Sequence, residues 1–210
     1  MKVRPILFSS EMVQAILAGE KTQTRRVVNP QPASRGALIT TPADQIWYTF
    51  PCDDGVERFA RCPYGKIGDW LWVRETWAVH KELDRIVPRD CIGSKVWFYA
   101  TDHRDEWCGR WRPSIHLPYD FHRIDLEVID VRCERLQSIS ESDAEAEGIE
   151  PRIPNHVVGA VYRYAQLWNS INAKRGYSWD SNPFVWVVSF RVVAPQPRLA
   201  PDPASCESQA

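Results

Sequence analysis

One short segment of the sequence, Gly19–Arg26, concentrates residue types that can do chemistry. It holds a lysine, two threonines and two arginines directly after a glycine. Side chains two residues apart share a face of an extended chain. Thr22, Thr24 and Arg26 are therefore expected on one face, and Lys21 on the other unless the turn after the glycine rotates it inward. A simpler interpretation also stands, because cations favour a helix C-terminus and threonine favours strands.

Glu147 is the second residue of chemical interest. It directly precedes Gly148, a glycine that is expected to end a helix, where a carboxylate is mildly unfavourable. A carboxylate beside a lysine orients it and exchanges protons with it, and a desolvated lysine moves toward neutrality and serves as a base. With Lys21 as base and Glu147 as its partner, the hydroxyl of Thr24 acts as nucleophile or holds the attacking water. The alternative is that Glu147 is solvated surface like the acidic residues around it.

Other polar and aromatic residues fit the wall of a binding pocket. Arg74, Glu75 and Trp77 leave a predicted strand together, so the indole can stack on a base while the charged groups bond its edge. The competing interpretation is a surface ion pair beside a core tryptophan. Ser114 and His116 alternate on one face of another predicted strand, where a histidine can exchange protons. A lone histidine there is more often structural.

A metal site is not expected. Two cysteines and two histidines come closest to a ligand set, but their spacing matches no usual zinc pattern: Cys91, His103, Cys108 and His116. The sequence also has no Gly-rich phosphate-binding loop and no nucleophile-elbow motif. We therefore expect a site without metal or cofactor.

The elements that must position these residues predict an α+β fold. Strands are expected at 2–8, 45–50, 70–74, 95–101, 122–132 and 184–193. Helices are expected from Ser9 or Ser10 to Leu17, from a Ser140 cap to Gly148, and over 157–174. The strands favour an antiparallel or mixed barrel in one domain spanning 1–193. Segments rich in Pro and Gly predict two insertions, one at about 29–63 that carries a hairpin and one at about 78–110. The tail 194–210 is expected to be disordered.

Composition limits the classes of function. The chain has 210 residues, ten tryptophans and a net charge of −1, from 26 Lys+Arg against 27 Asp+Glu. Proteins that bind long nucleic acids through phosphates are usually basic, so near neutrality favours a small ligand. Six cysteines without a paired spacing, no secretion signal and no long apolar run predict a cytoplasmic protein with no membrane association.

Several short motifs, in order, resemble the ASCH superfamily. The pattern Gly19-x-Lys21-x-x-Thr24-x-Arg26 is similar to the family signature G-x-K-x-x-[E/T]-x-R. Four further segments of this chain resemble family motifs. Residues 4–8 resemble the first strand of the family, and residues 68–73 resemble its G-D-x-L-x-V strand. Residues 136–148 resemble its L-x-x-I-[ST]-E helix, and residues 185–191 resemble its closing strand. The runs at 73–77 and 111–116 resemble the phage and prophage branch of the family.

The resemblance implies a PUA-like barrel that handles a nucleobase or nucleoside. Small bacterial members deacylate N4-acetylcytidine with a Lys, a Thr and a Glu, which correspond to Lys21, Thr24 and Glu147 here. Thr22 and Arg26, with the pocket-wall residues above, are the expected substrate contacts. The partner is then a modified nucleoside or single-stranded RNA, with no obligate protein partner. Alternatives are a module that binds RNA or a modified base without turnover, a ribonuclease, and a phage assembly factor.

Overall fold

The computed structural model describes residues 1–32, 37–40, 46–51, 57–91, 97–102, 104, 106–150 and 158–193. Strands and a few helices alternate along this chain, so the fold class is α+β, as predicted. Contacts divide it into two compact units. The first contains Met1–Lys2, Ala15–Trp70 and Glu127–Arg191, and the second contains Val3–Gln14, Leu71–Leu126 and the end of the last strand from Val192.

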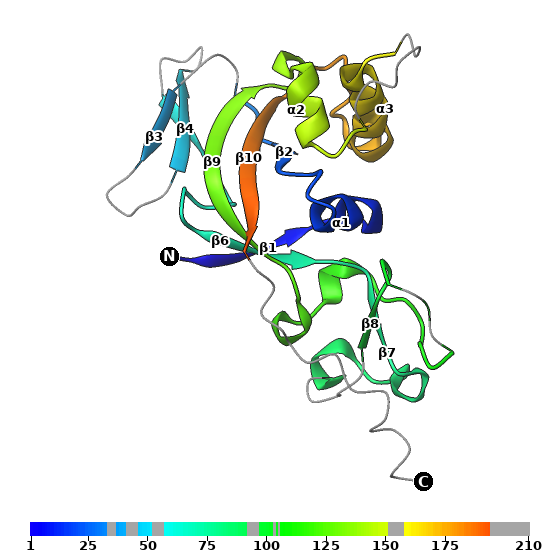
Figure 1. Ribbon diagram of the computed structural model, residues 1–210. Coiled ribbons are helices and arrows are strands. Elements are labelled where there is room, and N and C mark those ends of the chain that lie inside the picture. The colour runs from blue at the N-terminus through cyan, green and yellow to red at the C-terminus, as the bar shows by residue number, and fades with distance from the viewer. Residues whose placement is uncertain are drawn as a thin grey trace. The chain divides into compact units, whose positions relative to one another are not determined.

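Five strands form the main sheet in the order β1-β6-β9-β10-β2. Their bounds are Val3–Leu7 for β1, Gln23–Val27 for β2, Trp70–Arg74 for β6, Asp125–Arg135 for β9 and Phe184–Val193 for β10. In Figure 1 the long strands β9 and β10 curve side by side. Strand β10 pairs antiparallel with β2, with Val188 opposite Thr24. Because β1 and β2 stand at the two ends of this order, the described strands form an open sheet and not the closed barrel that we expected.

Burial along β9 changes phase part-way along the strand. Leu126 and Val128 are fully buried, Ile129 is 46% exposed, and Val131 is buried again. Side chains of a regular strand alternate between faces, so two consecutive residues between the buried positions 128 and 131 shift the pattern by one. The strand therefore presents its second half to the interior in a new register.

Three further strands form a separate antiparallel sheet, β3-β4-β5, within the first predicted insertion. They run over Ala37–Thr40, Ile46–Pro51 and Glu57–Arg61. Our expectation of a hairpin there was incomplete, because a third strand, β5, pairs with β4. The sequence of β5 alternates charged and apolar residues only briefly, which left it unrecognised.

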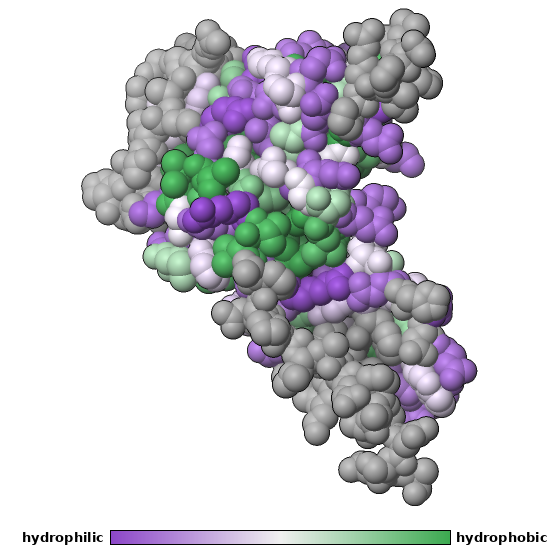
Figure 2. Space-filling view, in the orientation of Figure 1, coloured by the Kyte–Doolittle hydropathy of each residue, from purple (hydrophilic) through white to green (hydrophobic). Residues whose placement is uncertain are grey.

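Two helices cover β10 and give the first unit its core. Helix α2 spans Glu141–Ala146 and α3 spans Ala160–Asn172. Their apolar faces meet the sheet in one cluster of buried residues: Leu136, Ile139, Ala144, Ala160, Tyr164, Trp168, Val185 and Val187. Burying such side chains is worth about 1.5–3 kcal/mol each. Figure 2 shows a mainly hydrophilic surface over α2, so the helix is amphipathic.

The second unit has its own small core. Strands β7 (Trp77–Val79) and β8 (Trp97–Tyr99) pair antiparallel, and short 3₁₀ helices η1 to η4 surround them at Lys81–Leu83, Pro88–Cys91, Ser114–His116 and Tyr119–Phe121. Its buried residues are Trp77, Val79, Tyr99, Leu117 and Phe121. Helix α1, Ser10–Leu17, has residues in both units and begins at Ser9, whose Oγ accepts the Met12 amide at 3.4 Å. The predicted tail, 194–210, lies outside the described residues.

Candidate functional site

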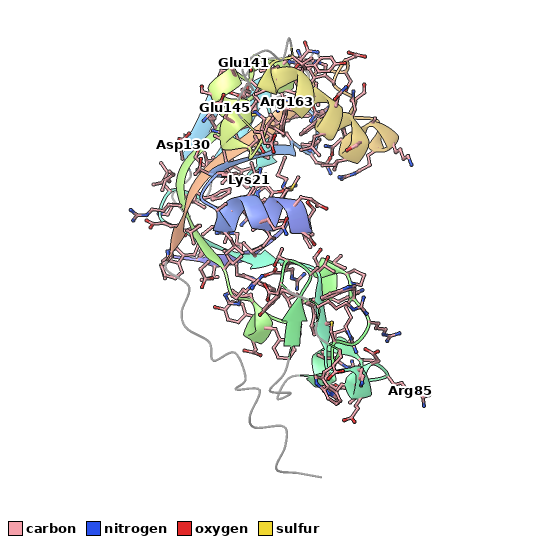
Figure 3. The ribbon with its side chains drawn as sticks, turned by 45° about the vertical axis from the view of Figure 1, so that its right-hand side comes forward. Lys21, Arg85, Asp130, Glu141, Glu145 and Arg163 are labelled. Carbon is pink, nitrogen blue, oxygen red and sulfur yellow. The ribbon has the colours of Figure 1, made fainter. Side chains whose placement is uncertain are left out.

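The capping of α2 brings Glu147 to the interior. Ser140 Oγ accepts the Asp143 amide at 3.1 Å and Asp143 Oδ2 accepts the Ser140 amide at 3.3 Å, which is the capping box that the sequence predicts. The helix then ends at Glu147, and Gly148 follows with φ of 87°. Glu147 is buried there, whereas the Glu141 carboxylate at the other end of α2 (Figure 3) accepts the Ala160 amide at 2.6 Å at the start of α3.

Close packing at Gly148 joins this helix end to the entrance of β2. The backbones of Lys21 and Glu147 form an isolated antiparallel bridge, and the Thr22 amide donates to Ala146 O at 2.8 Å. A Cβ at Gly148 would lie 3.1 Å from the Ala15 Cβ and 3.2 Å from the Lys21 Cβ. The glycine is therefore required twice, by its left-handed φ and by the lysine that passes beside it.

Lys21 and Glu147 form a buried ion pair at this junction. The Lys21 Nζ donates to Glu147 Oε2 at 2.8 Å and to the Glu147 carbonyl oxygen at 2.7 Å. The two residues are only 2% and 6% exposed. Burial lowers the pKa of Lys21 below its ordinary 10.5, and the Glu147 carboxylate opposes this fall without cancelling it. The amine is thus shifted toward its neutral form while held in one position.

Arg25 completes the charge balance around Glu147. Its Nη1 donates to Gln23 Oε1 at 2.6 Å and to Glu147 Oε1 at 3.3 Å. Its Nη2 donates to Glu134 Oε1 at 2.9 Å and lies 3.3 Å from Asp143 Oδ2. Each oxygen of the Glu147 carboxylate is thereby matched to one cation, which fixes its orientation.

An outer arginine links the same carboxylates at the edge of the network. Arg132 contacts Asp143 Oδ1 at 2.9 Å, Glu134 Oε2 at 3.2 Å and Asp130 Oδ2 at 3.3 Å. Burial alone would raise the pKa of Asp143, but the Ser140 hydrogen bonds and the two arginines hold it below its ordinary value. The capping residue of α2 is therefore also part of the charged network.

The pleat of β2 separates the other signature residues from this network. Gln23 and Arg25 face Glu147, so alternation directs Thr24 to the opposite face of the strand. Thr24 is 2% exposed and stands opposite Val188, whereas Thr22 is exposed and Arg26 is half-buried. Lys21 thus takes the face on which regular alternation places it, with its neighbours at 23 and 25.

Sequence reasoning did not assign Arg25, Glu134 or Asp143 to the site. The spacing of Lys21, Gln23 and Arg25 was a usable signal, because three polar residues at alternate positions mark one face of a strand. No local signal connects this strand to Glu134, which is 109 residues away from Arg25 in the chain. Pairings over such distances follow from the strand order of the sheet.

The proposed pocket-wall residues Arg74, Glu75 and Trp77 lie in the second unit. The Arg74 guanidinium lies over the Trp72 ring at 4.6 Å, and burial lowers its pKa. Glu75 is buried and accepts two hydrogen bonds from Arg123, at 2.9 and 3.0 Å, while burial raises its pKa. Trp77 is fully buried and packs edge-on against Phe121. These contacts favour the core interpretation for Trp77.

Ser114 and His116 do not alternate on a strand, so that prediction was wrong. They form the 3₁₀ helix η3, which begins after Pro113. Proline fixes its own φ and donates no amide hydrogen bond, so the segment turns where a strand would have needed a ladder partner. His116 is exposed, and its side chain lines a cavity that we consider below.

No described part of the chain gathers three His, Cys, Asp or Glu groups in a geometry that would hold a metal ion. Of the four residues that we considered for zinc, His103 lies outside the described residues, Cys108 is buried, and its thiol donates to the Gly109 carbonyl oxygen at 3.5 Å. The described helices include none that is both long and apolar enough to cross a membrane.

Comparisons with known proteins give little more. No family model matches the chain, and no curated protein matches it. One similar solved structure is protein EF3133 from Enterococcus faecalis V583, described as a DUF984 family member. The two share 13% sequence identity with a TM-score of 0.41, over 92% of this chain and 80% of that one. A likeness at this level identifies neither a fold family nor an activity.

Proposed function

We propose that this chain is an ASCH-type, PUA-like protein that hydrolyses the amide of an N4-acylated cytosine nucleoside. The buried Lys21–Glu147 ion pair supports the proposal most directly. It stands at the start of the strand that carries Thr24, whose side chain lies on the opposite face of that strand. A cytoplasmic location is part of the same proposal.

The chemical argument rests on the cost of burying two charges. Removing an ion from water costs several kcal/mol even after relaxation, and a well-packed apolar pair is often more stable. A lysine with a lowered pKa is a useful proton acceptor near neutral pH. Glu147 would then be a positioning residue that holds the amine and limits the fall of its pKa, whereas the charge of Arg25 lowers that pKa further while its guanidinium orients the Glu147 carboxylate.

In the proposed step, an oxygen nucleophile attacks the acyl carbonyl carbon of the substrate. The nucleophile is a water molecule, because the Thr24 side chain lies on the opposite face of β2 from Lys21, and neutral Lys21 accepts its proton. The C–N4 bond breaks, and the protonated lysine returns the proton to the leaving N4 amine, which yields cytidine and the carboxylic acid.

A spectrophotometric assay of N4-acetylcytidine hydrolysis tests this function. Wild type should turn over, and Lys21→Met should lose at least about a hundredfold in kcat/KM because it removes the proton acceptor. The matched control is Glu145→Gln, which removes a carboxylate from the outer side of α2 and should keep wild-type turnover. A folded wild type with no turnover would refute the hydrolase for this substrate.

A second candidate is a module that binds a modified base or single-stranded RNA without turnover. It is favoured by one observation: Lys21 and Glu147 are buried and bonded to each other, as in a purely structural pair. Equilibrium binding of N4-acetylcytidine to a wild type that does not hydrolyse it would support this candidate. Measured stability of Lys21→Met then tells whether the pair serves the fold alone.

A further inference from the structure

A cavity in the second unit combines cationic, aromatic and proline side chains. It has a volume of about 300 Å³ and is lined by Pro88, Arg110, Trp111, Arg112, Pro113 and His116. Ligand pockets in proteins usually span about 300–1,000 Å³, so this cavity fits a single small molecule and not a polymer. Its residues belong to a different unit from Lys21 and Glu147.

Among the described residues, the lining carries positive charge and includes no carboxylate. Two guanidinium groups and an imidazole can meet an anion, and the Trp111 indole and two proline rings offer flat apolar surface. Arginine matches the geometry of phosphate oxygens with paired N–H donors. Tryptophan is the side chain on which planar rings stack most favourably. This combination is typical of sites for an anion that carries a ring.

Arg112 supplies a buried charge that the described part of the chain holds through carbonyl oxygens and not through an acid. Its guanidinium is held by three carbonyl oxygens, those of Ile86 at 2.8 Å, Leu83 at 3.0 Å and Asp84 at 3.3 Å. The residue is 5% exposed, and its Nε has no hydrogen-bond partner. Within the described residues it forms no ion pair, so its charge is free to act on a ligand in the cavity.

Arg110 supplies a second, exposed charge at the same wall. The Asp84 carboxylate accepts the Arg110 main-chain amide at 2.9 and 3.1 Å, which fixes the backbone. The Arg110 side chain itself is exposed. The next residue in the chain is Trp111. The Arg104 guanidinium lies 5.7 Å from the centre of its ring and contacts the indole. An aromatic ring beside an exposed cation suits recognition of a ring and a phosphate together.

We propose that this cavity binds a small organic phosphate that carries a planar ring, of the nucleoside monophosphate class. The ring stacks on Trp111. The phosphate accepts hydrogen bonds from Arg110 and His116 and is attracted by the buried charge of Arg112. The site is independent of the hydrolase proposed above and requires no covalent step.

Isothermal titration calorimetry with cytidine 5′-monophosphate tests the site. Wild type should bind one equivalent. Cytidine lacks the phosphate, inorganic phosphate lacks the ring, and benzoate carries a singly charged carboxylate in place of the phosphate. Each of the three should therefore bind at least about tenfold more weakly. Cytidine or benzoate binding as tightly as the monophosphate would overturn the proposed ligand class. Absence of saturable monophosphate binding at millimolar concentration would overturn the site.

Three variants locate the binding. Arg110→Ser should weaken monophosphate binding at least about tenfold, the usual worth of a charge-assisted hydrogen bond. The control Arg85→Ser removes an equally exposed cation that projects outward from this unit and does not line the cavity, and it should leave binding unchanged. Lys21→Met should also leave it unchanged. Equal effects of the Arg110 and Arg85 substitutions, or loss only with Lys21→Met, would contradict the proposed location.

Discussion

At the scale of single residues, the behaviour of Lys21 follows from two opposing effects. Burial disfavours its charge and lowers its pKa, while Glu147 favours the charge and raises it, and burial prevails. Arg25 also binds the Glu147 carboxylate. Lys21 therefore donates to only one of the two Glu147 carboxylate oxygens, Oε2, while Arg25 donates to the other. Glu147 is the group that opposes the effect of burial on the pKa of this amine.

Glu147→Gln should lower the pKa of Lys21 further, because it removes the charge that opposes desolvation. NMR titration of lysine side chains labelled with ¹³C and ¹⁵N measures this directly. The Lys21 resonances are expected to titrate at lower pH than in wild type, and those of Glu145→Gln at the wild-type pH. An identical Lys21 titration in all three proteins would contradict the role of this contact.

Cys133 offers an independent check of burial in the first unit. Burial, followed by the nearby Cys62 and Glu134, raises the pKa of its thiol to about 12 from an ordinary 9.0. Only the thiolate reacts with alkylating agents, so at pH 8 the folded protein should be modified at Cys133 at least about a hundredfold more slowly than the unfolded protein. Peptide mass spectrometry after iodoacetamide treatment gives both rates. Comparable rates would show that this strand is open to solvent.

At the scale of elements, the sequence predicted local structure well and long-range contacts poorly. Residues with strong local signals behaved as expected: Ser140 and Asp143 cap α2, and Gly148 ends it. The pairing of Lys21 with Glu147 needed a family resemblance, since the two lie 126 residues apart. The prediction for Ser114 and His116 was wrong because a segment of three residues after a proline is compatible with either a strand or a 3₁₀ turn.

The junction of α2 and β2 predicts a specific cost for Gly148→Ala. The left-handed φ alone costs an alanine about 1–2 kcal/mol, and the contacts with Ala15 and Lys21 add about 1 kcal/mol or more. Gly176→Ala is the matched control, because Gly176 has φ of 85° and nothing within 4 Å of its added Cβ. Urea unfolding should show the larger loss at Gly148. Equal losses would mean that the junction is loosely packed.

At the scale of the whole molecule, charge and architecture limit the partner. The net charge of −1 gives no general attraction for phosphate chains. The described chain forms two compact units, each with its own core and its own polar site. A protein of this kind is better suited to small ligands bound by local groups than to a long nucleic acid.

Binding of an unmodified single-stranded RNA should therefore be weak and only slightly dependent on salt. Fluorescence anisotropy with a labelled oligonucleotide at low and physiological ionic strength measures both quantities. Few phosphate contacts should give a change in affinity of less than about tenfold between about 50 and 200 mM salt. Tight binding with a steep salt dependence would favour the RNA-binding module over the nucleoside hydrolase.

The pH dependence of kcat/KM for N4-acetylcytidine hydrolysis by wild type tests the central claim most directly. If neutral Lys21 is the proton acceptor, kcat/KM should rise with pH through one ionisation that lies below the ordinary lysine value of 10.5. That apparent pKa should equal the one at which the Lys21 resonances titrate. A folded wild type without turnover, or a rate that does not follow the Lys21 ionisation, would contradict the assignment of this ion pair to catalysis.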